Sequence, residues 1–532
     1  MLRRRAVIVL GSVSLTALAL SAALAGPCKQ EIAACGRTEC AHLHGQERRF
    51  CLSMCGGRAG CPLGGPAPIR TLAYVVTECR DGPEGFSSRQ ALRVRRGDHE
   101  PITVAASPAT GPVDLSSQEA AFEATLGYRK LCEAFGAFRV GGASTFLGVF
   151  HRLRVSPDGS AVVFEVTDDY TSMLPLQGIL PPEREGIFFV RSDGTGLQRL
   201  GRASREPSFF FELGGAAVVW APYELRFSPD GRRIVYTDRG PGPGGEEATQ
   251  VFTLEVGGGK PARQVTRLPS GPTWEGGGNR TVGPPWFIDN ETIGFGTTAK
   301  IDGENPEGTP VGVTVRVDGT GLRVFPLPSP AAAGSVVPVF AVTGARPAVT
   351  VVGLPGPAVN STPPAGIREV LLVDGTRLLQ LTNLRRFDTG TPTMRPGGRR
   401  VFFPASADPS GTNPGQECQL FSISRLGTRL RQLTFFRTVD RAVNGCWPIP
   451  ESRECEIGGS LNVQDPRTGT LVFGSTCDPF GANAYGEQIF ALRPDGSGLR
   501  QLTSTRGLVR GASGIVETEL PGPVAYSGAP LP

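Results

Sequence analysis

The sequence predicts an all-β fold: a β-propeller of six to seven four-stranded antiparallel blades, preceded by a small N-terminal Cys-rich disulfide segment. Two observations predict it. Glycine and proline are unusually frequent, with 72 and 47 of 532 residues, and both residues interrupt helices. Short runs of Val, Ile, Phe and Leu also recur along the chain between turn residues, which is typical of many short strands. The same composition excludes a coiled coil and an ordinary helical bundle.

A turn followed by a β-rich run is the first half of a repeated phrase. Residues 153–166 read LRVSPDGSAVVFEV, and residues 225–237 read LRFSPDGRRIVYT. In each S-P-D-G tetrapeptide, Pro presets a backbone φ angle of the turn and Asp bonds to the nearby backbone. Gly then takes the left-handed conformation that other residues adopt only at a cost. Each phrase therefore predicts two strands joined by a tight turn.

An apolar strand, an Asp-Gly turn and a closing strand form the second half of the phrase. The turns stand at Asp193, Asp318, Asp374 and Asp495, and the last strand ends in Gln-Leu-Thr at Gln380, Gln432 and Gln501. The resulting units are 153–200, 225–267, 285–325, 338–382, 394–434 and 461–503, with a weaker unit at 71–104. Their spacing of about 50 to 70 residues is the length of a propeller blade.

The two ends of the ring are predicted to meet in one blade. Residues 514–519 and 523–527 have the pattern of two further strands, and we expect them to complete the blade that begins at residue 71. Closing a ring in this way removes open sheet edges. Counting this shared blade favours seven blades over six.

The N-terminus has the parts of a secretory signal peptide. Arg3, Arg4 and Arg5 precede an apolar run over residues 6–20, and an Ala-Leu-Ala cleavage site follows at 23–25. No later run is long and apolar enough to span a bilayer. We expect a signal peptide at 1–25, a Cys-rich disulfide segment at 26–66 and a propeller at 67–532. The location predicted for the mature chain is periplasmic or secreted.

An even number of cysteines in an exported chain favours disulfides. The twelve candidates are Cys28, Cys35, Cys40, Cys51, Cys55, Cys61, Cys79, Cys132, Cys418, Cys446, Cys455 and Cys477. The alternative is a metal site, because His42 and His44 follow Cys40 closely, but the chain has no Cys-x-x-Cys pair. The pairing stays open, since six cysteines alone allow 15 connectivities.

The combination of S-P-D-G turns, V-D-G-T-G turns and R-Q-L-T endings resembles the TolB-type WD-like β-propeller repeat of exported bacterial proteins. The resemblance covers roughly residues 150–505. It implies antiparallel four-stranded blades around a channel. Exported members of this family include periplasmic scaffolds that contact envelope proteins, and similar propellers gate or accompany peptidases.

No reaction motif is recognisable along the chain. A Gly-x-Ser-x-Gly nucleophile elbow is missing, and the adjacent acids Asp168-Asp169 and Glu246-Glu247 fall in loops where a solvated turn explains them. The sequence identifies no catalytic, cofactor-binding or metal-binding residue and implies no cofactor. The net charge of +5 includes the three arginines of the leader, and the remaining basic residues form no cluster, which argues against nucleic acid.

The function expected from the sequence is therefore that of an exported, non-catalytic propeller, which is not an enzyme. It would act, as a monomer, as a scaffold for an envelope or secreted protein or for a polysaccharide. The alternative is a carbohydrate-active hydrolase or lyase with acidic residues at the mouth of the propeller channel. Propeller folds host many unrelated functions, so the fold leaves both open.

Overall fold

The structure is a computed structural model. It describes residues 30–59, 66–107, 110–113, 132–133, 150–167, 184–205, 209–213, 216–220, 225–257, 259–272, 281–283, 285–309, 311–326, 341–343, 346–354, 367–374, 377–386, 389, 392, 394, 399–437, 446, 457, 463–464, 468–481, 487–511 and 513–526.

Seven antiparallel sheets of three or more strands follow one another along the described chain, and we name them blades A to G. Blade A contains β1 (Thr71–Gly82), β2 (Gly85–Arg96), β3 (Ile102–Ala106), β4 (Thr110–Val113), β30 (Gly507–Arg510) and β31 (Val516–Tyr526). Blade B contains β5 (Phe150–Val155), β6 (Ala161–Val166), β7 (Gly186–Arg191) and β8 (Gln198–Gly201). Blade C contains β11 (Arg226–Phe227), β12 (Arg233–Pro241), β13 (Glu247–Glu255) and β14 (Arg263–Gln264).

The remaining blades repeat this order. Blade D contains β15 (Trp286–Phe287), β16 (Thr292–Thr297), β17 (Val311–Arg316) and β18 (Arg323–Pro326). Blade E contains β19 (Ala341–Thr343), β20 (Arg346–Leu354), β21 (Ile367–Asp374) and β22 (Arg377–Gln380). Blade F contains β23 (Arg400–Ala405), β24 (Gln419–Ser424) and β25 (Arg431–Gln432), and blade G contains β26 (Val463–Gln464), β27 (Leu471–Ser475), β28 (Gln488–Leu492) and β29 (Arg500–Gln501). A separate hairpin joins β9 (Phe209–Leu213) to β10 (Ala216–Trp220).

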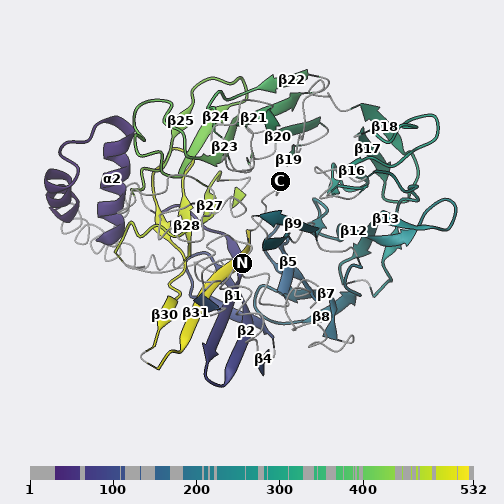
Figure 1. Ribbon diagram of the computed structural model, residues 1–532, viewed down its shortest axis with the longest axis horizontal. Coiled ribbons are helices and arrows are strands. Elements are labelled where there is room, and N and C mark those ends of the chain that lie inside the picture. The colour runs from purple at the N-terminus through teal and green to yellow at the C-terminus, as the bar shows by residue number, and fades with distance from the viewer. Residues whose placement is uncertain are drawn as a thin grey trace, which may run out of the picture.

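The blades lie around a ring, as Figure 1 shows. Within the described residues five blades have four strands, blade F has three and blade A has six. The β-propeller predicted from the sequence is therefore confirmed, although its blades are less uniform than expected. The ring closes where β31, from the C-terminal end, pairs with β1 along nearly its whole length, from Leu72 opposite Tyr526 to Asp81 opposite Val516.

The inner strands of the blades are buried on both faces. All six residues of β6 are buried, as are all five of β27, because each blade packs between two neighbours. The apolar side chains of adjacent blades accordingly form shared clusters, such as Val75 of blade A with Phe164 of blade B. This explains the continuous apolar runs after each S-P-D-G turn, where a half-exposed strand would alternate polar and apolar residues.

Each S-P-D-G turn is held by its own side chains. Ser156 Oγ donates to Asp158 Oδ1 at 2.6 Å and accepts from the Ala161 N–H at 3.0 Å. Gly159 has a positive φ of 79° and donates its N–H to the Ser156 carbonyl. The turn at 228–231 repeats these contacts at closely similar distances. The first and second strands of blades B and C are joined in this way.

A buried glutamine–threonine contact explains the Gln-Leu-Thr endings. In blade F, Gln419 Oε1 accepts from Thr434 Oγ1 at 2.8 Å and from the Phe436 N–H at 3.0 Å. Thr434 Oγ1 also accepts from the Leu420 N–H at 2.8 Å. The same contact joins Gln250 to Thr266 and Gln488 to Thr503, and in blade E Glu369 takes the place of the glutamine. The threonine thus fastens the end of the fourth strand to the third.

The turn aspartates make the stability of the ring sensitive to acid. At Asp193 and Asp318, hydrogen bonds from the hydroxyl and N–H of the threonine two residues later lower the carboxyl pKa. At Asp158, Asp230 and Asp495, burial opposes this shift, but the hydrogen bonds outweigh it and the pKa is again lowered. A carboxyl group with a lowered pKa in the folded state stabilises the fold above its unfolded pKa, and this contribution is lost as the pH falls.

We therefore expect the thermal unfolding midpoint to fall between about pH 5 and pH 3, where unfolded aspartate titrates. In Asp318→Asn the amide oxygen can still accept from Thr320, whose N–H donates at 2.9 Å and whose Oγ1 donates at 2.6 Å, but the group no longer titrates. Its fall with pH should be shallower than that of the unchanged chain. Equal slopes for the two proteins would contradict this assignment.

The Cys-rich segment is helical, which the sequence did not predict. Residues 30–38 are helical and α2 spans Gly45–Arg58. Disulfides join Cys35 to Cys55 and Cys40 to Cys51 in this segment, and Cys79 to Cys132 and Cys418 to Cys446 elsewhere. Cys477 is also disulfide-bonded; Cys28, Cys61 and Cys455 lie outside the described residues.

These disulfides indicate a non-cytoplasmic, oxidising location. None of the helices that the structure describes combines the length and the apolar character needed to cross a bilayer.

Candidate functional site

A pocket lies where α2 meets the last two blades. Figure 1 shows α2 at the outer side of the ring, on the side of β24, β25, β27 and β28. Successive strands of a blade run in opposite directions, so the loops after the second and the fourth strand emerge on the same face. Residues 435–437 follow the last strand of blade F, and residues 477–479 follow β27, the second strand of blade G. One face of the ring therefore supplies both loops, and α2 covers them.

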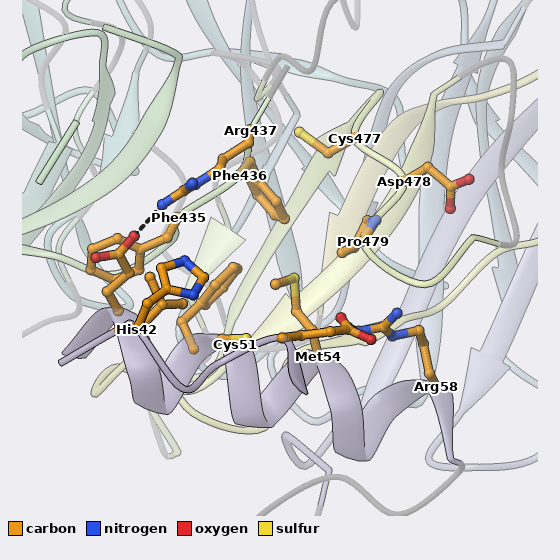
Figure 2. A pocket seen from close by; sticks show the side chains of 14 residues that line it. His42, Cys51, Met54, Arg58, Phe435, Phe436, Arg437, Cys477, Asp478 and Pro479 are labelled. Atoms are coloured by element: carbon orange, nitrogen blue, oxygen red, sulfur yellow. Dashed lines mark hydrogen bonds and ion pairs between the residues drawn. The ribbon is translucent and has the colours of Figure 1, made fainter. Parts of the chain in front are cut away.

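The floor of the pocket is aromatic. The Phe50 ring of α2 lies 5.7 Å from the Phe435 ring and 5.4 Å from the Phe436 ring, the second pair being edge-to-face. Phe50 is buried, with 1% of its surface exposed, and Met54 from the next turn of α2 packs against the same apolar cluster and lines the pocket (Figure 2). The cavity has a volume of about 330 Å³, at the lower end of the range for small-molecule sites.

Charged side chains form the rim. Arg437 Nη2 lies 2.5 Å from Glu47 Oε1, and Arg58 pairs with Glu39. Asp478 is the third carboxylate, and Figure 2 shows it on the blade G side of the cavity, across from His42. The arginines of both pairs are more than one-third exposed, so the pairs contribute little stability and their charges can reach a ligand.

The acid pairs singled out from the sequence do not form a site in the described part of the chain. Glu246 and Glu247 lie at the β12–β13 hairpin. Glu246 Oε2 accepts from the Gly244 N–H at 2.9 Å, and Glu247 pairs with Arg205 at 3.2 Å. Asp168 and Asp169 fall outside the described residues. The solvated-turn interpretation of Glu246 and Glu247 therefore agrees with their contacts.

Cysteine, histidine and carboxylate side chains can together hold a metal ion, and the sulfur atoms of Cys35, Cys40 and Cys55 lie within 4.8 Å of one another. All three are in disulfides. A metal needs a thiolate, so these residues are not a metal site in this state.

A buried charged network between blades B and C was missed by the sequence analysis. Arg152 Nε lies 3.0 Å from Glu165 Oε2, and each side chain is 1% exposed. Glu165 Oε1 accepts from the Ser204 N–H at 2.7 Å, and Ser204 Oγ donates to the Thr237 carbonyl. The network therefore joins β6 to the second strand of the next blade.

Two further buried arginines lie on the first strands of the same two blades, one at the second position of each L-R-x-S-P-D-G phrase. Burial, together with the neighbouring charge of Arg226, holds the pKa of Arg154 well below its ordinary value. Burial alone lowers the pKa of Arg226 to about 10. The repeated arginine of the phrase was the signal that could have located this cluster.

The sequence matches no family model and no curated protein. Solved structures that it resembles include the β-propeller domain of the trilobed protease from Pyrococcus furiosus, with 7% identity over 68% of this chain and 85% of that one and a TM-score of 0.36. A prolyl endopeptidase structure shares 11% identity over 91% of this chain and 53% of its own, with a TM-score of 0.38. An oligogalacturonate lyase from Vibrio parahaemolyticus shares 11% identity over 65% of this chain and 89% of its own, with a TM-score of 0.32.

These comparisons correct the functional expectation. The structures just described are enzymes or propeller domains of enzymes, which contradicts the prediction of a non-catalytic scaffold and the prediction that the chain is not an enzyme. At these identities they carry over no substrate and no catalytic residue, and this chain spans about half of the prolyl endopeptidase.

Proposed function

We propose that the protein is a carbohydrate-active hydrolase or lyase and that its substrate binds in the pocket between α2 and blades F and G. The observation that carries the proposal is the pairing of an aromatic floor with a rim of three carboxylates and two guanidiniums. Apolar faces of sugar rings pack on aromatic side chains, while their hydroxyls and any carboxylate need hydrogen-bonding and charged partners.

The rim contains the groups that cleavage of a glycosidic bond requires. Hydrolysis takes a pair of carboxyl groups on either side of the bond, one as acid and one as base or nucleophile. Glu39, Glu47 and Asp478 supply three candidates. In a lyase reaction a base removes a proton next to a carboxylate, and Arg58 or Arg437 would bind that carboxylate. In this proposal the acids belong to the pocket formed by the helical segment and blade G, whereas the sequence analysis expected them at the channel mouth.

The finer assignments belong to the same proposal. We infer that the blades are of the TolB-like type, because the S-P-D-G turns and the glutamine–threonine contacts recur in several of them. We also infer that residues 1–25 direct export and that the mature chain is periplasmic or secreted, which is supported by its disulfides.

The test uses the oxidised chain from residue 26 onward, incubated with a panel of neutral and uronate-containing polysaccharides. New reducing ends report either reaction, and ultraviolet absorbance of unsaturated uronates reports a lyase. We expect Asp478→Asn and Glu47→Gln to lose about 100-fold or more of the activity, as is usual for an acid or base catalyst. Glu246→Gln, an exposed turn carboxylate far along the chain, is the matched control.

Two outcomes would overturn the proposal. One is the absence of cleavage across the whole panel by a folded, oxidised chain. The other is equal cleavage by Asp478→Asn, Glu47→Gln and Glu246→Gln, which would place the chemistry elsewhere. A parallel panel of peptide substrates would separate a carbohydrate-active enzyme from a peptidase.

A further inference from the structure

Two disulfides of the helical segment lie side by side. They join Cys35 to Cys55 and Cys40 to Cys51. The sulfur atoms of Cys40 and Cys55, which belong to different disulfides, are 3.7 Å apart. This is van der Waals contact, so a small side-chain movement would bring one sulfur to bonding distance of the other.

The four cysteine residues differ in their exposure to solvent. Cys35 is half-buried, whereas Cys40, Cys51 and Cys55 are 0%, 6% and 3% exposed. A thiol from solution therefore reaches Cys35 first. The guanidinium Nη2 of Arg58 lies 3.6 Å from Cys35 Sγ. Its positive charge, shared with Glu39, stabilises the negative charge that builds up on sulfur during thiolate attack.

We propose that these two disulfides form a thiol–disulfide relay that delivers a free thiolate to Cys51 in the wall of the pocket. In the first step an external thiolate attacks Cys35 Sγ, a mixed disulfide forms, and the Cys35–Cys55 bond breaks to leave Cys55 as thiolate. In the second step Cys55 attacks Cys40 Sγ, a Cys40–Cys55 bond forms, and the Cys40–Cys51 bond breaks to leave Cys51 as thiolate. One external thiol is consumed, and the number of disulfides is conserved.

The second step competes well with solvent because its reactants are already in contact. The Cys55 thiolate is released 3.7 Å from its target sulfur, and holding two reacting groups at contact raises their effective concentration far above that of a free thiol. Cys51 lines the pocket. The relay therefore converts a redox signal at the surface into a nucleophilic sulfur beside the aromatic floor. It does not depend on the enzymatic activity proposed above.

The disulfides outside the segment supply internal controls. Cys79–Cys132 and Cys418–Cys446 are mainly buried, with Cys132 0% and Cys418 1% exposed. Among the residues that the structure describes, Cys35, Cys40 and Cys55 are the only three cysteines whose sulfur atoms all lie within 4.8 Å of one another. Exchange with a third cysteine is therefore expected in the helical segment and not at these two bonds.

The relay is tested by titrating the folded, oxidised chain with reduced glutathione until the first disulfide opens. The reaction is then stopped with acid, free thiols are alkylated, and the peptides are mapped by mass spectrometry. We expect glutathione on Cys35, a new Cys40–Cys55 link and the alkyl group on Cys51, with both control disulfides intact. The denatured chain should lose this selectivity.

Two results would overturn the relay. If the alkyl group is found on Cys55 while Cys40–Cys51 is intact, the second step does not occur. If Cys79–Cys132 or Cys418–Cys446 opens first, the segment is not the reactive site. In the double variant Cys40→Ser/Cys51→Ser the relay has no second disulfide, and the alkyl group should remain on Cys55. This variant keeps the Cys35–Cys55 bond, and the mapping of the unchanged chain is decisive even if it folds poorly.

Discussion

Replacing Phe50 with alanine is expected to remove about 3–5 kcal/mol of stability from the packing of α2 on the propeller, the usual cost of deleting a buried phenylalanine ring. Phe50 is 1% exposed and lies within 6 Å of both the Phe435 and the Phe436 rings. The buried cluster that contains it also includes Leu433 and Phe473. Its loss would leave a cavity under the helix that these rings fill only in part.

The measurement is denaturant unfolding combined with hydrogen exchange of the amides of α2 (Gly45–Arg58). Leu426→Ala is the matched control, because Leu426 is 82% exposed on a turn of blade F and should change stability by about 0.5 kcal/mol or less. If protection of α2 is the same in Phe50→Ala as in the unchanged chain, the helix is not held by this ring. In that case contacts other than those of the Phe50 ring would hold α2 over the pocket.

The second large effect is expected at the buried ion pair of blade B. Glu165→Ala leaves the Arg152 guanidinium enclosed without this carboxylate, and breaking a buried pair in this way typically costs about 3–5 kcal/mol. The Ser204 N–H also loses its acceptor, so the contact between blades B and C weakens at the same time.

An exposed ion pair of the same ring provides the comparison. Arg89 Nε lies 2.6 Å from Glu78 Oε2, with side chains 63% and 31% exposed. Glu78→Ala should cost less than about 1 kcal/mol, since solvent screens such a pair. Urea unfolding of both variants measures the difference. Similar losses for Glu165→Ala and Glu78→Ala would show that burial does not govern the strength of these pairs.

The repeat was predictable from the sequence because its information is local. A Ser, a Pro, an Asp and a Gly in succession specify a turn through their own side chains, and the bonds from Ser156 to Asp158 are those the pattern predicts. The closing blade was predictable for a related reason: two β-rich runs remained after the last complete unit. The structure joins them into the single strand β31, whose register shifts opposite Tyr74 to Val76.

The pocket was not predictable, because its residues meet only through long-range packing. Glu47 and Arg437 are 390 positions apart. Glu47 belongs to no motif, and only the cysteines of its segment led to a structural prediction. The sequence of α2 also has no strong apolar stripe that would predict packing on the propeller. Its aromatic contacts come from a single ring, that of Phe50. The pairing of the cysteines stayed open for the same reason, because spacing does not say which chain segments fold together.

The pairing of β1 with β31 also governs the order in which the protein can be completed during synthesis. The first strand of the ring leaves the ribosome early, and its partner leaves more than 400 residues later. Throughout that interval one edge of β1 has no partner strand, and its first seven residues, which are all buried in the folded ring, are open to pairing with another chain. Closure over such a separation is intrinsically slow. The pairing of β1 with β31, which closes the ring, is therefore also the pairing that forms last. Until β31 has been made, the open edge of β1 has to be kept from pairing with other chains.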